Sequence, residues 1–111
     1  MKLSGVFDLQ VLTNPQTASY TPVLTDAYKL VEMNVATANN FTVPPNSSVA
    51  FKIGTIIDIA QYGAGQTTIV AGAGVTLRAP GAALKIAEQY SIVTIIKRAT
   101  DEWYVTGNLT T

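Results

Sequence analysis

The feature that most constrains this chain is the alternation of short, β-branched apolar runs with Gly, Pro and Asn clusters, spaced roughly eight to twelve residues apart. β-Branched side chains restrict χ1 and fit the pleated surface of a sheet better than a helix. Residues 55–61 show the pattern most clearly, because one face carries Thr55, Ile57, Ile59 and Gln61. The pattern predicts an all-β fold, a compact antiparallel β-sandwich or a jelly-roll-like single domain.

The same reasoning predicts the other strands and the turns between them. Asn14-Pro15 and Asn39-Asn40 are expected to be turns. Residues 82–90 contain good helix formers, but no N-cap precedes them, and we expect a strand followed by a turn. Further strands are expected at residues 6–12, 29–34, 41–43, 66–71, 75–78, 91–97 and 103–106.

Two Gly-Ala-Gly sequences, at residues 63–65 and 72–74, resemble the start of a phosphate-binding loop. A dinucleotide fingerprint needs a third glycine and a following helix, and here strand-like sequence follows both. Two tight hairpins in series explain them better. The alternative is a repeat unit used twice, although a β-solenoid needs at least three such units.

The chain has 111 residues, which is enough for one domain. We divide it into an N-terminal arm at residues 1–14 and a β-rich module at residues 15–111. Residues 1–12 show neither the apolar stretch of a signal peptide nor that of a membrane span.

Composition argues against several classes of function. The chain has no His and no Cys, so the usual general base, the thiol nucleophile and the preferred zinc ligands are missing. We therefore expect no enzymatic activity, no catalytic residue, no metal site and no cofactor. Charged residues are 13% of the chain and the formal net charge is +0, so we expect neither nucleic acid nor a membrane as a partner.

Aromatic side chains are the candidate recognition or interface residues. Adjacent Trp103 and Tyr104 must point to opposite faces of a strand, so one belongs to the core and the other to the surface. Tyr and Trp suit both protein interfaces and stacking on sugars. The candidates are Tyr20, Tyr62, Tyr90, Trp103 and Tyr104. Among the carboxylates, Asp58 lies between two isoleucines, and we expect it to make a structural hydrogen bond to a turn or to a neighbouring subunit.

A combination of short motifs spans the chain from Leu24 to Leu109. The motifs are residues 25–31, 43–48, 51–55, 63–69, 72–76 and 101–109. Together they resemble a small β module of tailed-bacteriophage virion proteins, often found at the C-terminal end of tail fibres or other structural proteins. The resemblance implies a non-enzymatic structural role in the virion and carries no catalytic motif.

The resemblance and the short leading segment together favour a capsid decoration or cement protein that bridges capsid subunits. We expect a homotrimer that contacts the major capsid protein or another virion protein. The arm is expected to dock on that neighbour through Leu3, Val6, Phe7 and Leu9, or else only to complete the domain's own sheet. The alternative function is a receptor- or glycan-binding tip that uses exposed aromatics and the loops at residues 34–40 and 44–48.

Overall fold

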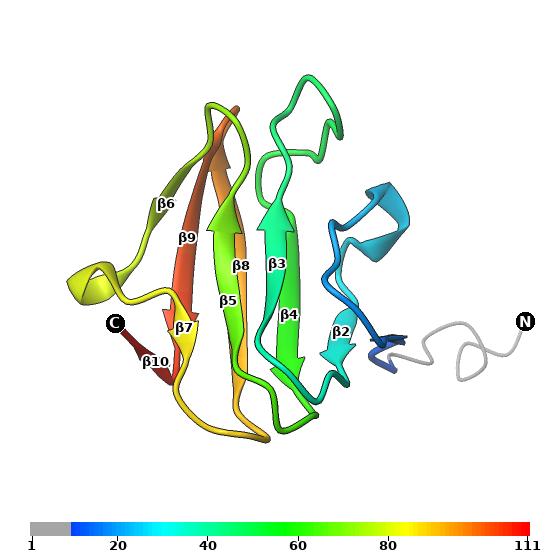
Figure 1. Cartoon of the computed structure of the whole chain (residues 1–111). Coiled ribbons are helices and arrows are strands. Elements are labelled where there is room, and N and C mark those ends of the chain that lie inside the picture. The colour runs from blue at the N-terminus through cyan, green and yellow to red at the C-terminus, as the bar shows by residue number, and fades with distance from the viewer. Residues whose placement is uncertain (1–9) are drawn as a thin grey trace, which may run out of the picture.

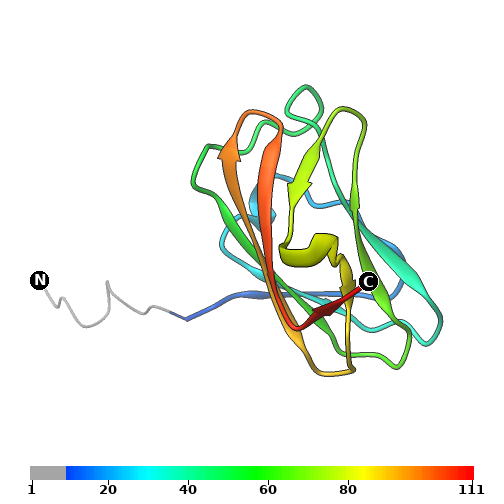
Figure 2. The same ribbon diagram turned by 90° about the vertical axis from the view of Figure 1, so that its left-hand side faces the viewer.

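Two mixed β-sheets face each other across one core (Figures 1 and 2). The structure is a computed structural model that describes residues 10–111. The larger sheet has the order β1 (Thr13–Gln16), β2 (Leu30–Met33), β4 (Ile56–Gln61), β8 (Ile92–Ala99), β9 (Glu102–Gly107) and β6 (Thr76–Arg78). The smaller sheet has the order β10 (Leu109–Thr110), β7 (Lys85–Ile86), β5 (Thr67–Ala71) and β3 (Asn39–Val43). Two 3₁₀ turns, η2 (Leu24–Asp26) and η3 (Pro80–Ala82), lie between strands.

The all-β single-domain prediction is confirmed, but the expectation of antiparallel pairing throughout is wrong. β4, β8 and β9 pair antiparallel, as do β5, β7 and β10. The pairs β1–β2, β2–β4, β3–β5 and β6–β9 are parallel. The reason is that the chain crosses to the other sheet after β2 and again after β4. Strands from successive crossings therefore lie side by side in the same direction.

Two of these crossings stack on each other at one end of the sandwich. Leu30 pairs with Asp58 in the larger sheet, and Asn39 pairs with Thr67 in the smaller one. In both strand pairs, β2–β4 and β3–β5, each residue therefore lies beside the residue 28 positions later in the sequence. The segments that connect these strands keep the same offset. The repeating unit of this half is a passage across both sheets, as in a β-solenoid, and its length differs from the nine-residue spacing of the glycine motifs.

The stacking explains the glycines of residues 63–65. A Cβ on Gly63 would lie 2.5 Å from the backbone of Val35, and a Cβ on Gly65 would lie 2.0 Å from the carbonyl oxygen of Thr37. Ala64 between them is exposed. The prediction of two hairpins in series is wrong, because each Gly-Ala-Gly sequence joins strands of different sheets, β4 to β5 and β5 to β6.

β1 adds a third, shorter passage to the stack. It pairs parallel to β2, and Tyr20 forms a parallel bridge with Phe41 of β3. The predicted turn at Asn14-Pro15 is wrong, because both residues lie in β1. Pro15 is tolerated there because β1 is an edge strand, where a missing backbone N–H costs no ladder hydrogen bond.

The predicted turn at Asn39-Asn40 is also wrong, since these residues begin β3. The buried side chain of Asn39 is satisfied locally: its amide donates to Thr37 O at 3.0 Å and its oxygen accepts from Thr67 Oγ1 at 2.7 Å. Of the strand expected at residues 6–12, residues 10–12 lie outside any strand, and the others are outside the described residues. Residues 13–14 of the expected arm belong to β1.

Alternation along the strands fills the core as predicted. Ile57 and Ile59 of β4 are fully buried, and Trp103 is 1% exposed while Tyr104 is 49% exposed. Residues 82–90 run from the end of η3 through β7 into a turn, which confirms the strand-and-turn prediction. The core also contains Val31, Met33, Phe41, Val43, Phe51, Ile69, Ile86, Val93, Ile95 and Val105.

Candidate functional site

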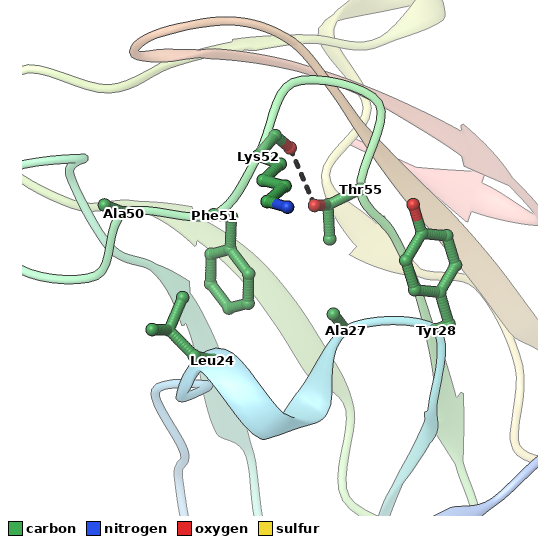
Figure 3. A pocket seen from close by; sticks show the side chains of 7 residues that line it. All are labelled: Leu24, Ala27, Tyr28, Ala50, Phe51, Lys52 and Thr55. Atoms are coloured by element: carbon green, nitrogen blue, oxygen red, sulfur yellow. Dashed lines mark hydrogen bonds between the residues drawn. The ribbon is translucent and has the colours of Figure 1, made fainter.

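An apolar cleft opens beside η2, at the end of the sandwich where β2 and β4 begin. Its volume is about 270 Å³. One wall comes from η2 and the following turn, and the other from the segment before β4 (Figure 3). The cleft is lined by Leu24, Ala27, Tyr28, Ala50, Phe51, Lys52 and Thr55. A second hollow adjoins it and shares Leu24 and Ala50 with it, so the two form a continuous groove.

The wall formed by η2 is held by the carboxylate of Asp26, which is 1% exposed. The carboxylate accepts hydrogen bonds from Asn14 Nδ2 at 2.7 Å, Tyr20 OH at 2.6 Å and Val23 N at 2.9 Å. Burial and the hydrogen bond to Asp26 raise the pKa of the Tyr20 phenol above its ordinary value. Asp26 thereby ties η2 to the edge strand β1.

The opposite wall is held by Lys97, which is 2% exposed. Its ammonium donates to Phe51 O and to Asn46 Oδ1, each at 2.7 Å. The Phe51 ring packs edge-on against Trp103 at a centroid distance of 5.7 Å. Among residues 10–111, Asp26 and Lys97 are the buried charged residues, and each fixes one wall of the cleft.

A pH-dependent contribution to stability follows from Lys97. Burial lowers the pKa of its ammonium below the ordinary 10.5, while the carboxylate of Asp101 opposes this shift. Between the lowered pKa and 10.5 the unfolded chain binds more protons, so Lys97 makes stability rise with pH in that window. This contribution is fully present above the pKa that Lys97 has in the unfolded chain. It is lost as the pH falls through the lower pKa that Lys97 has in the folded protein.

The measurement is urea unfolding of the wild type and of Lys97→Met, from pH 7 to about 10.5. We expect the free energy of unfolding of the wild type to rise relative to that of the variant as the pH increases. The difference between the two proteins cancels the titration of the groups they share. Two curves that stay parallel over this range would contradict the assignment.

The rim of the cleft carries exposed apolar side chains and one unusual backbone conformation. Val23, Leu24 and Tyr28, which line the cleft or the hollow beside it, are 50%, 56% and 65% exposed. Tyr28 has a φ of 64°, a left-handed conformation that few non-glycine residues adopt. It lies where the chain turns from η2 into β2, and backbone strain of this kind concentrates at functional sites.

The predicted aromatic candidates do not form one surface. Tyr62 and Tyr90 are exposed and pack edge-on at 6.0 Å. Tyr104 lies on the outer face of the larger sheet, under the guanidinium of Arg98 at 5.9 Å. Tyr20 is half-buried against Asp26, and Trp103 is a core residue, so the prediction that they are exposed recognition residues is wrong for Trp103.

The two loops proposed for recognition lie at opposite ends of the sandwich. Residues 34–38 precede β3 and residues 44–48 follow it (Figure 1). A single ligand-binding tip cannot combine them. The arm candidates Leu3, Val6, Phe7 and Leu9 lie outside the described residues.

Asp58 makes a structural hydrogen bond, accepting from Thr94 Oγ1 at 2.5 Å, but the partner lies in the neighbouring strand β8 and not in a predicted turn or subunit. Within residues 10–111 no group of three or more Asp or Glu side chains is arranged to hold a metal ion. In the same part of the chain, no helix has the length and apolar character needed to span a membrane.

Comparison with known proteins identifies no relative. No protein-family model matches the chain, and neither the curated proteins nor the solved structures include a significant match.

Sequence reasoning missed the cleft, and one signal could have pointed to it. Val93, Ile95 and Lys97 alternate along one strand, which places Lys97 on the buried face of an apolar run. A buried lysine needs acceptors, so a specific contact was foreseeable there. Its partners Asn46 and Phe51 were not, because they are about 50 residues away in the sequence.

Proposed function

We propose that this protein is a non-enzymatic structural component of a bacteriophage virion. Within that class we propose a capsid decoration or cement protein, a homotrimer that bridges neighbouring capsid subunits. The resemblance of residues 24–109 to a virion β module supports the assignment to the virion. The rigid two-sheet body and its apolar cleft support a role in binding another protein.

The observation that carries this proposal is that buried charged residues hold the walls of the cleft. Both buried charges of the described chain, Asp26 and Lys97, are used to hold its walls. Burying a charge is unfavourable unless it is fully hydrogen-bonded. The groove nevertheless leaves Val23, Leu24 and Tyr28 exposed in one area, a feature typical of protein contact sites.

Bridging would work mechanically. An apolar side chain of a capsid subunit inserted between Leu24 and Phe51 would remove the exposed Leu24 side chain from water and add buried interface. Many such contacts over a shell would oppose its expansion by packaged DNA. Low charge suits this role, because the neutral body repels neither its own copies nor the shell strongly.

A receptor- or glycan-binding tip is the second candidate, and the Tyr62–Tyr90 pair favours it. The two rings lie at 68° to each other and are 53% and 70% exposed. Tyr90 has a φ of 71°, so it too occupies an unfavourable backbone conformation. Two exposed rings at an angle could contact adjacent faces of a sugar.

Electron cryomicroscopy of the native particle tests the location. We expect density for the chain over the capsid shell, at symmetry axes and in high copy number. Density only at the tail or at a distal tip would overturn decoration in favour of recognition. Absence from the whole particle would overturn the virion assignment.

A pair of variants tests the surface. Leu24→Asp places a charge at the rim of the cleft, and we expect it to weaken binding to undecorated shells by about tenfold or more. Tyr90→Asp is the matched control, because this exposed side chain lies at the far end of β4 and should leave binding unchanged. The reverse ranking would contradict the role of the cleft.

A further inference from the structure

β6 forms one open edge of the larger sheet, next to β9 (Figure 1). Thr76 N donates to Asp101 O at 2.9 Å, so the N–H of Thr76 faces the side on which β9 lies. Successive backbone groups of a strand point to opposite sides, so the N–H and C=O of Leu77 and the N–H of Ala79 face away from the sheet. The carbonyl of Ala79 agrees with this direction, since it accepts from Ala82 N at 3.0 Å in η3.

A hollow of about 450 Å³ opens along this edge, and its lining comes from β6, η3 and the outer face of β9. The residues that line it are Leu77, Arg78, Ala79, Pro80, Ala82 and Tyr104. The extended backbone of β6 continues through Ala79, which has φ −122° and ψ 140°. The chain then turns at Gly81 and Ala82, which have φ of 64° and 56°. Few non-glycine residues adopt the conformation of Ala82, and backbone strain of this kind concentrates at functional sites.

Two arginines give the edge a positive charge. Arg78 Nε donates to Glu102 Oε2 at 2.7 Å, and Arg98 Nη1 donates to Glu102 Oε1 at 2.6 Å. One carboxylate thus serves two guanidinium groups, which leaves the cluster with a net positive charge. The side chain of Arg78 is 62% exposed and reaches Glu102 through Nε, so its Nη atoms can pair with a further carboxylate.

We propose that the β6 edge binds an extended acidic segment of a partner protein, which joins the larger sheet as an added strand and pairs a carboxylate with Arg78. In this mode of recognition, main-chain hydrogen bonds supply affinity and side-chain pockets supply specificity. The outward backbone groups of Leu77 and Ala79 would make the main-chain bonds. The hollow beside them gives the added strand its space.

A second copy of this chain fits the edge poorly. Among residues 10–111, the other strands at sheet edges, β1, β3 and β10, contain no acidic residue. Two β6 edges placed together would bring the Arg78 side chains of both copies close to each other, and like charges repel. Charge complementarity therefore favours a partner of different sequence.

The consequence for assembly rests on the proposed function. A protein that bridges two subunits needs two separate contact surfaces. The cleft lies where β2 and β4 begin, and the second surface lies at β6, the edge strand beyond β8 and β9. An acidic segment of one capsid subunit would be held at β6 while an apolar side chain of its neighbour fills the cleft.

Peptide binding to the full chain tests the edge without a particle. The probe is a fluorescent heptapeptide that alternates threonine with glutamate, and its neutral counterpart carries glutamine in place of glutamate. By fluorescence anisotropy, we expect the acidic peptide to bind about tenfold more tightly than the neutral one or better. Arg78→Gln should weaken binding of the acidic peptide by about tenfold. Lys85→Gln removes the same charge from an exposed residue of the smaller sheet and should leave binding unchanged.

Amide hydrogen exchange tests the addition of a strand. The Leu77 N–H faces the open edge, and saturating acidic peptide should slow its exchange by about tenfold or more. Unchanged exchange at Leu77 in the bound state would overturn strand addition, because side chains alone would then hold the peptide. Equal binding of the two peptides, no binding of either, or equal loss in the two variants would overturn the acidic specificity.

These outcomes are separable from those of the proposed function. The peptide experiment uses no shell, so its failure leaves the virion role and the cleft in place. Loss of shell binding in Leu24→Asp would likewise leave the peptide result unchanged.

Discussion

Replacing Gly65 with alanine is expected to destabilise the protein by about 3 kcal/mol or more, because the new methyl group has no space. A Cβ at this position would lie 2.0 Å from Thr37 O and 2.3 Å from its carbonyl carbon. These atoms are backbone, so relief requires the two stacked corners to separate. Separation would break the hydrogen bond from Gly65 N to Val35 O.

The measurement is the free energy of unfolding in urea at 25 °C, with two matched controls. Ala64→Ser changes the exposed residue between the two glycines and should have an effect within about 0.5 kcal/mol. Gly74→Ala has a φ of +77° but no atom within 4 Å of the added Cβ, so it should cost only about 1–2 kcal/mol. If Gly65→Ala were as mild as Ala64→Ser, the stacked-corner account would be wrong.

Replacing Asp26 with alanine is expected to cost about 3 kcal/mol and to loosen the cleft. The substitution removes the acceptor of Asn14 Nδ2, Tyr20 OH and Val23 N at a buried position. A buried donor left without a partner costs about 1–3 kcal/mol, and some of these donors will regain water. The tie between β1 and η2 is lost with them.

Asp26→Asn is the matched control, since it keeps the shape and one acceptor oxygen. We expect it to be less destabilising than the alanine variant. It also removes the negative charge beside Tyr20, so the raised pKa of the Tyr20 phenol should move toward its ordinary value. A tyrosinate absorbance titration measures this pKa, and an unchanged value would contradict the hydrogen bond between the two side chains.

The strand pattern was predictable because the alternation of side chains in a strand depends only on neighbouring residues. Side chains alternate with a period of two, so burial of Ile57 and Ile59, and the opposite placement of Trp103 and Tyr104, could be inferred from a few neighbouring residues. The predictions that failed concern positions whose local conformation depends on contacts with residues far away in the sequence. Asn39 was predicted to be in a turn, but its side chain is satisfied by Thr67, 28 residues away, and the backbone continues as a strand.

The sequence by itself determined that this chain is an all-β single domain, and which faces of its main strands are buried. The tertiary structure decided that the chain crosses between sheets, that the crossings stack in parallel, and that Asp26 and Lys97 hold the two walls of a cleft. The physical reason is the range of the interactions. Alternation and turn propensity act over a few residues, whereas strand pairing and buried charge satisfaction join residues whose proximity no local pattern encodes.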